Sequence, residues 1–268
     1  MPRGMQGEQS VRTRFVSPGL LVVLAAFIVS RIAFERAGVR YDAANLDTWW
    51  HFIDPALLRT RLLESLWYLH TQPPLFNLFL GLVLKASGQY YPAVFSAVYQ
   101  LLGLALGFGL LRLMIRLDVT EWLATLLTVV FIVSPSCILY ENWLFYTFPL
   151  CVMLVLSALC LERWLEREHG VDLVLFFVLL AMLALTRNLF HLFWLVVIIL
   201  ALLVLRRARW KQILAASAVP LLLVLGLYVK NLVLFNSFTS STWLGMSLAR
   251  FTTLTFTPEE QERLVASG

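Results

Sequence analysis

The sequence contains few charged residues and few cysteines. Only 14% of its 268 residues are charged, whereas 60% are hydrophobic, and the mean hydropathy is +0.81. A chain of this length with so little polar surface does not cover an apolar core in water, so lipid is the expected solvent for most of it. The composition therefore predicts an integral membrane protein.

Several common functional classes are excluded because their motifs are missing. The chain has no P-loop, no GxGxxG after a strand, no GxSxG and no HExxH, which are the signatures of major nucleotide-binding, hydrolase and zinc-peptidase classes. Cys137, Cys151 and Cys160 lie in apolar runs without CxxC spacing, which is typical of small buried residues and not of a metal site. The net charge of +5 indicates no nucleic-acid partner, because the basic residues cluster at the ends of apolar runs.

Apolar runs recur along the chain, and most approach the ~20 residues that a membrane-spanning helix needs. Residues 1–19 form a tail with several arginines, and no A-x-A-like cleavage site follows the first run. We therefore expect an uncleaved signal anchor with a cytoplasmic N-terminus. The run Pro73–Ala86 is too short to be trusted as a full crossing. The runs are Leu20–Val29, Pro73–Ala86, Pro92–Ile115, Trp122–Leu139, Trp143–Leu161, Leu173–Leu185, Leu189–Leu205 and Ile213–Phe235.

The positive-inside rule decides whether Pro73–Ala86 crosses. If every run spans, most internal cations face outward, against the rule. If Pro73–Ala86 is a re-entrant or interfacial helix on the outer side, these cations face the cytoplasm together. We therefore predict an all-α polytopic protein of the plasma (bacterial inner) membrane, with about seven transmembrane helices in residues 20–256. The cations are Arg112, Arg116, Arg163, Arg167, Arg206, Arg207, Arg209 and Lys211.

This topology brings the polar breaks of the chain to the extracytoplasmic face. The first loop, residues 35–72, is rich in acidic residues, histidine and tryptophan, and three further polar breaks follow at residues 140–142, 187–188 and 230–231. Ionisable groups near membrane depth are costly unless they are paired or line a wet cavity, so their convergence predicts a functional site. The alternative for any one of them is a helix-end residue that reaches toward the lipid headgroups.

These segments resemble the bacterial GT-C glycosyltransferases that use polyprenyl-phosphate sugars, a group that includes the aminoarabinose transferases and protein O-mannosyltransferases. The resemblance rests on the acidic first loop, followed by segments that occur in the family's order over nearly the whole chain. It implies a membrane enzyme of which this chain covers the catalytic front half, with residues 257–268 as a truncated extracytoplasmic tail. The segments are His70 to Leu75 (HTQPPL), Glu141 to Phe145 (ENWLF), Leu185 to Arg187 (LTR) and Lys230 to Phe238 (KNLVLFNSF).

The resemblance assigns the first-loop carboxylate to catalysis. Asp47 stands where the family has its first-loop acidic residue, so it is the expected general base, with Asp42 as the nearest substitute. Helix capping is the alternative role for Asp47. Many family members have a second acid directly after the first, whereas Thr48 stands here. A metal site of two adjacent carboxylates is therefore not expected, although a divalent ion held by Asp47 and Glu141 is left open.

The remaining candidate residues would contact the substrates. Arg187 is the expected clamp on the donor phosphate, because a guanidinium presents a fork of donors to phosphate oxygens. Glu141 would orient the acceptor, or would be only a helix-end residue. The other expected substrate-binding residues are His70, Gln72, Asn142 and Lys230.

The resemblance implies an inverting transfer of a sugar from a polyprenyl-phosphate carrier to an extracytoplasmic glycan, lipid or protein. The alternative is a non-catalytic transporter, flippase or scaffold subunit for a lipid-linked saccharide. A transporter is expected to show inverted repeats, and the sequence has no detectable internal repeat. The identities of the sugar and of the acceptor are left open.

Overall fold

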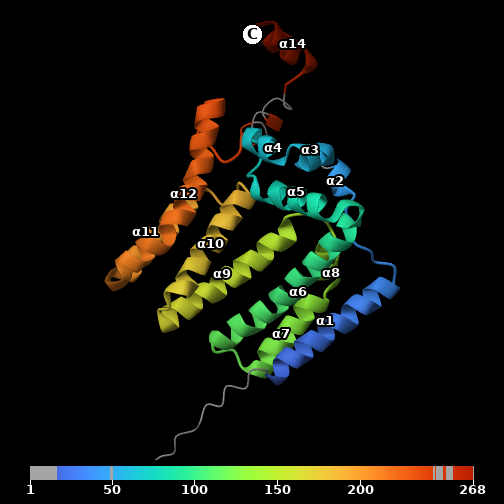
Figure 1. Ribbon diagram of the computed structural model, residues 1–268, viewed down its shortest axis with the longest axis vertical. Helices are drawn as coiled ribbons and strands as arrows, with labels where there is room; N and C mark the ends of the chain where they lie inside the picture. Colours follow the sequence, from blue (N-terminus) through green and yellow to red (C-terminus); the bar gives the residue numbers. More distant parts are fainter. Residues whose placement is uncertain (1–16, 49–50, 244, 246–249, 252–255, 268) are drawn as a thin grey trace, which may run out of the picture.

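The computed structural model describes residues 17–48, 51–243, 245, 250–251 and 256–267 (Figure 1). Apart from one isolated backbone bridge, these residues form helices and no strand, so the predicted all-α class is confirmed. Residues 1–16 of the expected tail lie outside the described part. The helices are α1 (Pro18–Arg36), α2 (Asn45–Thr48), α3 (Pro55–Thr60), α4 (Leu62–Tyr68), α5 (Leu75–Ser87), α6 (Tyr91–Arg116), α7 (Glu121–Val133), α8 (Pro135–Glu141), α9 (Thr147–Arg167), α10 (Gly170–Thr186), α11 (Leu192–Leu205), α12 (Trp210–Phe235) and α14 (Pro258–Ser267).

The described helices are long and apolar enough for a membrane protein. Four helical stretches could each cross a bilayer, and a fifth crossing results if α7 and α8 count as one bent span. The apolar helices α10 and α11 are shorter, at 17 and 14 residues. Membrane association follows from these lengths, whereas the arrangement of about seven spans stays a prediction. The four stretches are Pro18–Arg36, Leu75–Arg116, Thr147–Arg167 and Arg207–Phe235.

The predicted run Trp122–Leu139 is not one straight helix. It bends by 59° between α7 and α8. Pro135 has no N–H for the helical ladder and its ring disfavours helical backbone at the preceding residue. Ser134 accordingly has an extended backbone, and its hydroxyl accepts a hydrogen bond from the N–H of Cys137 (3.3 Å), which caps α8. The bend turns the end of α8 toward the first loop.

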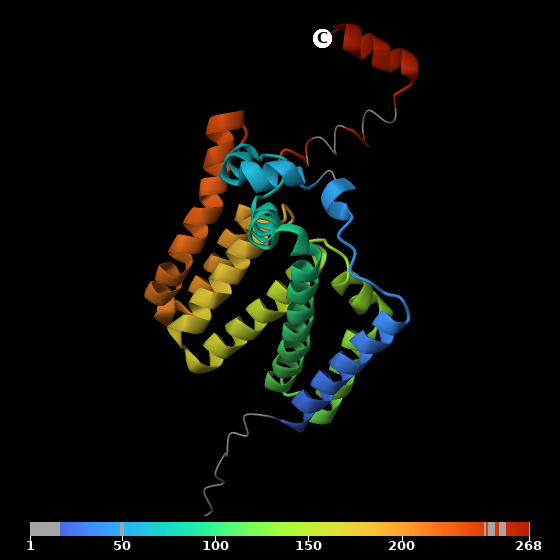
Figure 2. The ribbon, with the colours of Figure 1, turned by 45° about the vertical axis from the view of Figure 1, so that its right-hand side comes forward.

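The first loop folds into short helices that lie across one end of the longer ones (Figure 1). It contains α2, α3 and α4, and α5 follows directly after Pro73 and Pro74. Figure 2 shows α5 nearly end-on while α6 runs downward from it, so the two helices do not share an axis. The chain turns between them at Gly88, whose φ of +52° is a conformation that glycine adopts at little cost.

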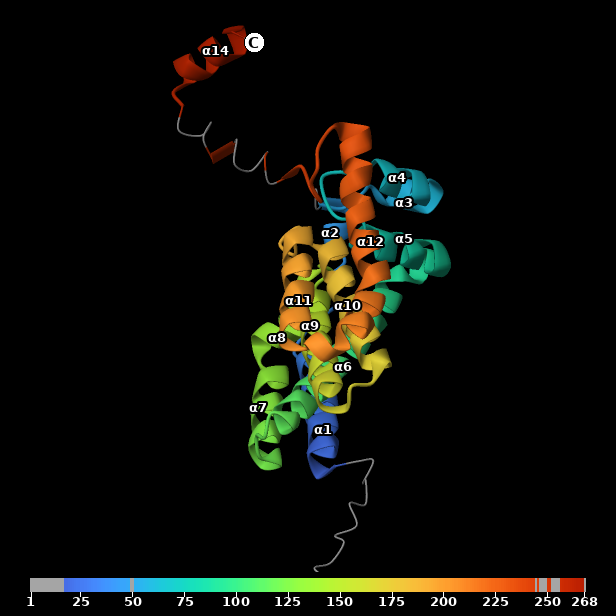
Figure 3. The same cartoon turned by 90° about the vertical axis from the view of Figure 1, so that its left-hand side faces the viewer.

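Figure 3 shows the helix connections at the end of the bundle opposite the first loop. Ion pairs join these connections. The N–H of Gly19 donates to the Glu121 carboxylate (3.1 Å), which fixes the start of α1 beside the start of α7. Cations from the predicted cytoplasmic set bind acids on neighbouring helices. Ion pairs between neighbouring helices therefore hold together the end of the bundle that lies opposite the first loop. These pairs are Arg116 with Glu162 and Glu166, Arg163 with Asp172, and Arg209 with Glu168.

The largest apolar core lies beneath the first loop. Its buried side chains come from α2 to α6 and from α8 to α12, and they include Phe76, Phe95, Phe148 and Phe177. A smaller core joins α1, α6 and α7. Because α5 contributes buried residues such as Phe76 and Leu80, it is packed against the bundle and fixes the position of the first loop above it.

Candidate functional site

The first loop is tied to the chain after α8 by backbone hydrogen bonds. The N–H of Asp42 donates to the carbonyl of Asn142 (2.7 Å), and the N–H of Leu144 donates to the carbonyl of Asp42 (2.9 Å). Asn45 adds a side-chain bond to the carbonyl of Leu144 (3.3 Å). Two of the predicted site residues, Asp42 and Asn142, are therefore neighbours although a hundred residues separate them in the sequence.

The carboxylates of Asp42 and Asp47 are both exposed, but they lie in different surroundings. Asp42 accepts a hydrogen bond from the N–H of Ala44 (2.8 Å), which orders the turn before α2. It also lines a cavity of about 320 Å³ together with Asn142 and Trp143. Asp47 lies on the short helix α2, outside that cavity. Neither carboxylate forms an ion pair with a described residue.

Arg187 lies beside an aromatic cluster that contains part of the first loop. It follows α10 with an extended backbone, and its guanidinium carbon lies 4.8 Å from the centre of the Tyr146 ring. The His51 ring stacks near Tyr146 (6.5 Å between ring centres) and meets Trp243 edge-on (5.5 Å). Arg187 has no acidic partner among the described residues, so its positive charge is not neutralised within that part of the chain.

The charge of Arg187 affects the groups beside it. Burial of the imidazole, and secondly the positive charge of Arg187, lower the pKa of His51. Burial raises the pKa of the Tyr146 hydroxyl, and the charge of Arg187 opposes that rise. Because its pKa is lowered, the His51 imidazole is uncharged at pH 7, where it can accept a hydrogen bond from a hydroxyl group while Arg187 stays the positive charge of the cluster.

The segment before the double proline is held by the end of α12 and the chain after it. Lys230 donates to the carbonyl of Leu69 (2.6 Å). The Nδ1 atom of His70 lies 2.9 Å from the Thr242 hydroxyl, and the N–H of Thr242 donates to the carbonyl of His70 (3.0 Å). Gln72 is buried, with 7% of its surface exposed. Lys230 and His70 thus have structural partners, and their predicted contact with a substrate stays a prediction.

Glu141 has a buried partner that the sequence analysis did not identify. Its carboxylate is 1% exposed and binds the guanidinium of Arg31 through two hydrogen bonds, Nε to Oε1 at 3.0 Å and Nη2 to Oε2 at 2.6 Å. Gly103 packs on the other side, because a Cβ there would lie 2.9 Å from the Glu141 carboxyl carbon. The geometry thus gives Glu141 an ion pair between α1 and α8, while its role toward an acceptor or a divalent ion stays a prediction.

Asn77 is a second residue that the sequence analysis missed. It is 2% exposed on α5, and its side chain accepts from the N–H of Ile53 (2.9 Å) and donates to the carbonyl of His51 (3.4 Å). The sequence does contain a signal for this role, because Asn77 is a polar residue within an apolar helix, three residues after a double proline. Asn77 positions the part of the first loop that carries the His51 ring.

The part of the chain that the structure describes contains no group of three or more His, Cys, Asp or Glu residues arranged to hold a metal ion. The four polar breaks of the chain nevertheless meet at one end of the bundle. Asp42 binds Asn142, the Tyr146 ring lies beside both His51 and Arg187, and Lys230 binds the carbonyl of Leu69. No family model, curated protein or solved structure matches the chain.

Proposed function

We propose that the chain is a membrane glycosyltransferase that moves a sugar from a polyprenyl-phosphate donor to an extracytoplasmic glycan, lipid or protein. One observation carries the proposal: the acidic first loop, residues 142–146 after α8, and Arg187 meet at one end of the helical bundle. A transferase of this kind needs a carboxylate and an anion-binding cation at the membrane surface, because the donor presents its anomeric carbon and its phosphate there.

The proposed reaction is a direct displacement at the anomeric carbon. The acceptor oxygen attacks that carbon and loses its proton to a first-loop carboxylate. The bond between the anomeric carbon and the phosphate oxygen breaks, and the lipid phosphate leaves with the electron pair. Attack from the face opposite the phosphate inverts the configuration. The resemblance favours Asp47 as the base, whereas the cavity that Asp42 shares with Asn142 and Trp143 favours Asp42.

Arg187 is the proposed partner of the donor phosphate. Its guanidinium has no acidic partner among the described residues, and a phosphate would supply the missing negative charge. The neighbouring His51 is neutral at pH 7, so it leaves Arg187 as the charge that attracts the anion. Trp143 at the cavity offers an aromatic face on which a sugar ring stacks.

We place this site on the extracytoplasmic side of the inner membrane, with seven spans and a cytoplasmic N-terminus. In this arrangement α5 lies along the outer surface, which agrees with its course across the helix ends in Figure 2. The basic residues at the opposite end would then face the cytoplasm, as the positive-inside rule requires.

The test is sugar transfer by the purified protein in lipid, with a panel of polyprenyl-phosphate sugars and release of the lipid phosphate as the readout. We expect Asp42→Asn to slow transfer by about 10²–10⁴-fold, the usual contribution of a general base. The same loss in Asp47→Asn with normal turnover in Asp42→Asn would identify Asp47 as the base. Asp54→Asn is the matched control, because the Asp54 carboxylate caps α3 in the same loop.

Arg187 is tested by donor binding. Arg187→Ala should weaken binding by about 2–5 kcal/mol, the usual loss when one partner of a buried charged pair is removed. Arg187→Lys should recover only part of this, since an ammonium does not bind two phosphate oxygens in a fork. Equal donor affinity in the wild type, Arg187→Ala and Arg187→Lys would show that Arg187 does not bind the donor. If the chain transfers sugar from no donor of the panel, the transport or scaffold alternative replaces the transferase.

A further inference from the structure

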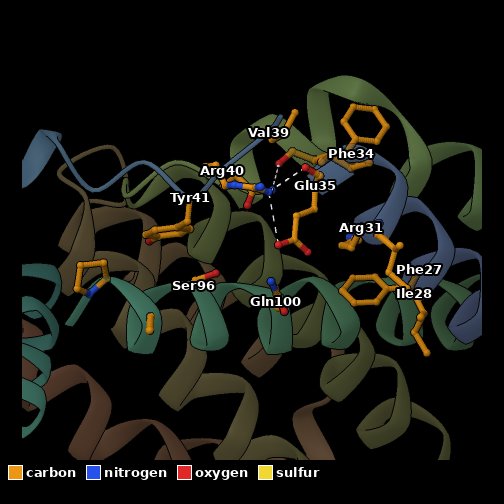
Figure 4. Close-up of a pocket in the computed structure, with 15 residues that line it drawn as sticks. Phe27, Ile28, Arg31, Phe34, Glu35, Val39, Arg40, Tyr41, Ser96 and Gln100 are labelled. Atoms are coloured by element: carbon orange, nitrogen blue, oxygen red, sulfur yellow. Dashed lines mark hydrogen bonds and ion pairs between the residues drawn. The ribbon is translucent and has the colours of Figure 1, made fainter. Parts of the chain in front are cut away.

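A cavity of about 520 Å³ lies between α1, the chain after α1, the start of α6 and the end of α8 (Figure 4). It is separate from the Arg187 cluster, and none of its polar residues except Asn142 was predicted from the sequence. Polar side chains line it from three sides. They are Arg31, Glu35, Arg40, Tyr41, Ser96, Gln100 and Asn142.

The polar groups converge because of their spacing. Ser96 and Gln100 are four residues apart on α6, so they lie on the same face of that helix. Figure 4 shows Glu35 and Arg40 on the opposite side of the cavity. Arg40 donates to the carbonyl of Glu35 (2.8 Å) and pairs with its carboxylate (3.4 Å).

Ser96 and Gln100 make no side-chain hydrogen bond within the described part of the chain. Both belong to the stretch Leu75–Arg116, which is apolar enough to span a bilayer. Polar side chains in such a helix are costly unless they meet a polar partner or water. Their hydrogen-bonding groups therefore face the cavity without a protein partner, which makes them available to a ligand.

The charges at the cavity cancel. Arg31 is neutralised by Glu141, and Arg40 by Glu35. An anionic ligand would find no unmatched cation here, in contrast to Arg187. The available groups are an amide, a hydroxyl and carboxylate oxygens, and this set binds uncharged hydroxyl groups, which both donate and accept.

One wall of the cavity is apolar and continues along α1, within the candidate membrane span Pro18–Arg36. Ile28 and Ile32 line it, and they are 48% and 46% exposed. They lie one turn apart within the candidate span Pro18–Arg36. A ligand that fills the cavity would therefore contact polar groups at one end and aliphatic side chains at the other.

We propose that this cavity binds a lipid with an uncharged, hydroxyl-rich headgroup, such as a glycolipid or a glycerol lipid. The headgroup lies between Glu35 and Gln100, and the tail runs along Ile28 and Ile32. The cavity adjoins the smaller one that Asp42 lines, because Val39, Arg40 and Asn142 line both. The proposal does not depend on the transferase reaction, because the groups offered to the lipid are those of Ser96 and Gln100 and not Arg187 or the carboxylate of Asp42.

The test uses the protein in zwitterionic lipid nanodiscs and a monoglucosyl diacylglycerol with a photoreactive tail. We expect crosslinks on α1 around Ile28 and Ile32, mapped by mass spectrometry. The Ser96→Ala, Gln100→Leu double variant should bind about tenfold more weakly, which is the effect of losing two ordinary hydrogen bonds. Arg187→Ala is the control and should label as the wild type does, so the outcome is independent of sugar transfer.

Competition experiments test which part of the lipid the cavity recognises. Unlabelled glycolipid should abolish the crosslink, whereas phosphatidic acid should compete at least tenfold less well and free glucose should not compete at the same concentration. Equal competition by phosphatidic acid would contradict the preference for an uncharged headgroup. Equal competition by glucose would contradict a contribution of the apolar wall to binding. Unchanged labelling of the double variant, with a wild-type melting temperature, would overturn the site itself.

Discussion

Removal of the Glu141 carboxylate should strongly destabilise the protein. Glu141 is 1% exposed and its partner Arg31 is 10% exposed. The Arg31 guanidinium also donates to the Ser30 hydroxyl (2.9 Å) and to the carbonyl of Ile132 (2.8 Å), so it is fixed in place. In Glu141→Gln the guanidinium would stay buried without its negative partner, and an amide N–H₂ would replace one acceptor. Breaking such a pair costs about 3–5 kcal/mol.

The assay is equilibrium unfolding in mixed lipid–detergent micelles, followed by helical circular dichroism. Glu64→Gln is the matched control, because the Arg61–Glu64 pair is 67% and 58% exposed with a separation of 3.9 Å. An exposed pair contributes about 0–1 kcal/mol. A double variant with methionine at Arg31 and Glu141 should lose less stability than Glu141→Gln, because no unpaired charge remains. A loss in Glu141→Gln no larger than in Glu64→Gln would refute the buried ion pair.

Two further predictions concern glycine packing and pH. Gly103→Ala should destabilise the protein by about 1–3 kcal/mol, because the added methyl group overlaps the Glu141 carboxylate. Gly226→Ala on α12, where nothing lies within 4 Å, should instead leave the unfolding midpoint equal or higher; equal losses in both would contradict the contact. The pKa of His51 is lowered in the folded state, so the unfolded chain binds more protons as the pH falls below about 6.5, and stability is lost there. Unfolding midpoints from pH 8 to pH 5 should therefore fall less in His51→Gln than in the wild type, and identical profiles would contradict the shift.

Local patterns were enough to predict most of the helices. Apolar runs place helices wherever a long stretch lacks polar residues, and α6, α10, α11 and α12 lie within a few residues of the predicted runs. The Ser134–Pro135 pair is also a local signal for the bend, although the sequence analysis predicts Trp122–Leu139 as one continuous run. Helix lengths were less well determined, because the ends depend on caps such as Ser134 and on the packing of each end.

The site could be predicted only in part. Polar residues stand out in an apolar chain, so the sequence predicts Asp42, Asn142 and Arg187 as candidate site residues. Their partners were not, since contacts such as Asp42 with Asn142 join residues that are distant along the chain. The assignment of the base to Asp47 or Asp42 is a choice between two exposed carboxylates of one loop, and the sequence alone favoured Asp47.

The sequence by itself determined the solvent, the all-α class and the end of the bundle to which the polar residues belong, because each follows from local hydropathy and charge. Only the tertiary structure decided which charges neutralise one another. Arg31 and Glu141 are 110 residues apart, and their pairing follows from the close packing of α1, α6 and α8 around Gly103. That pairing removes the charge of Glu141 from the surface. Arg187 lies in a different cluster, over the Tyr146 ring, where no described acidic residue pairs with it. Net electrostatics at a site depend on distances between helices, and those distances are set by packing across the whole bundle.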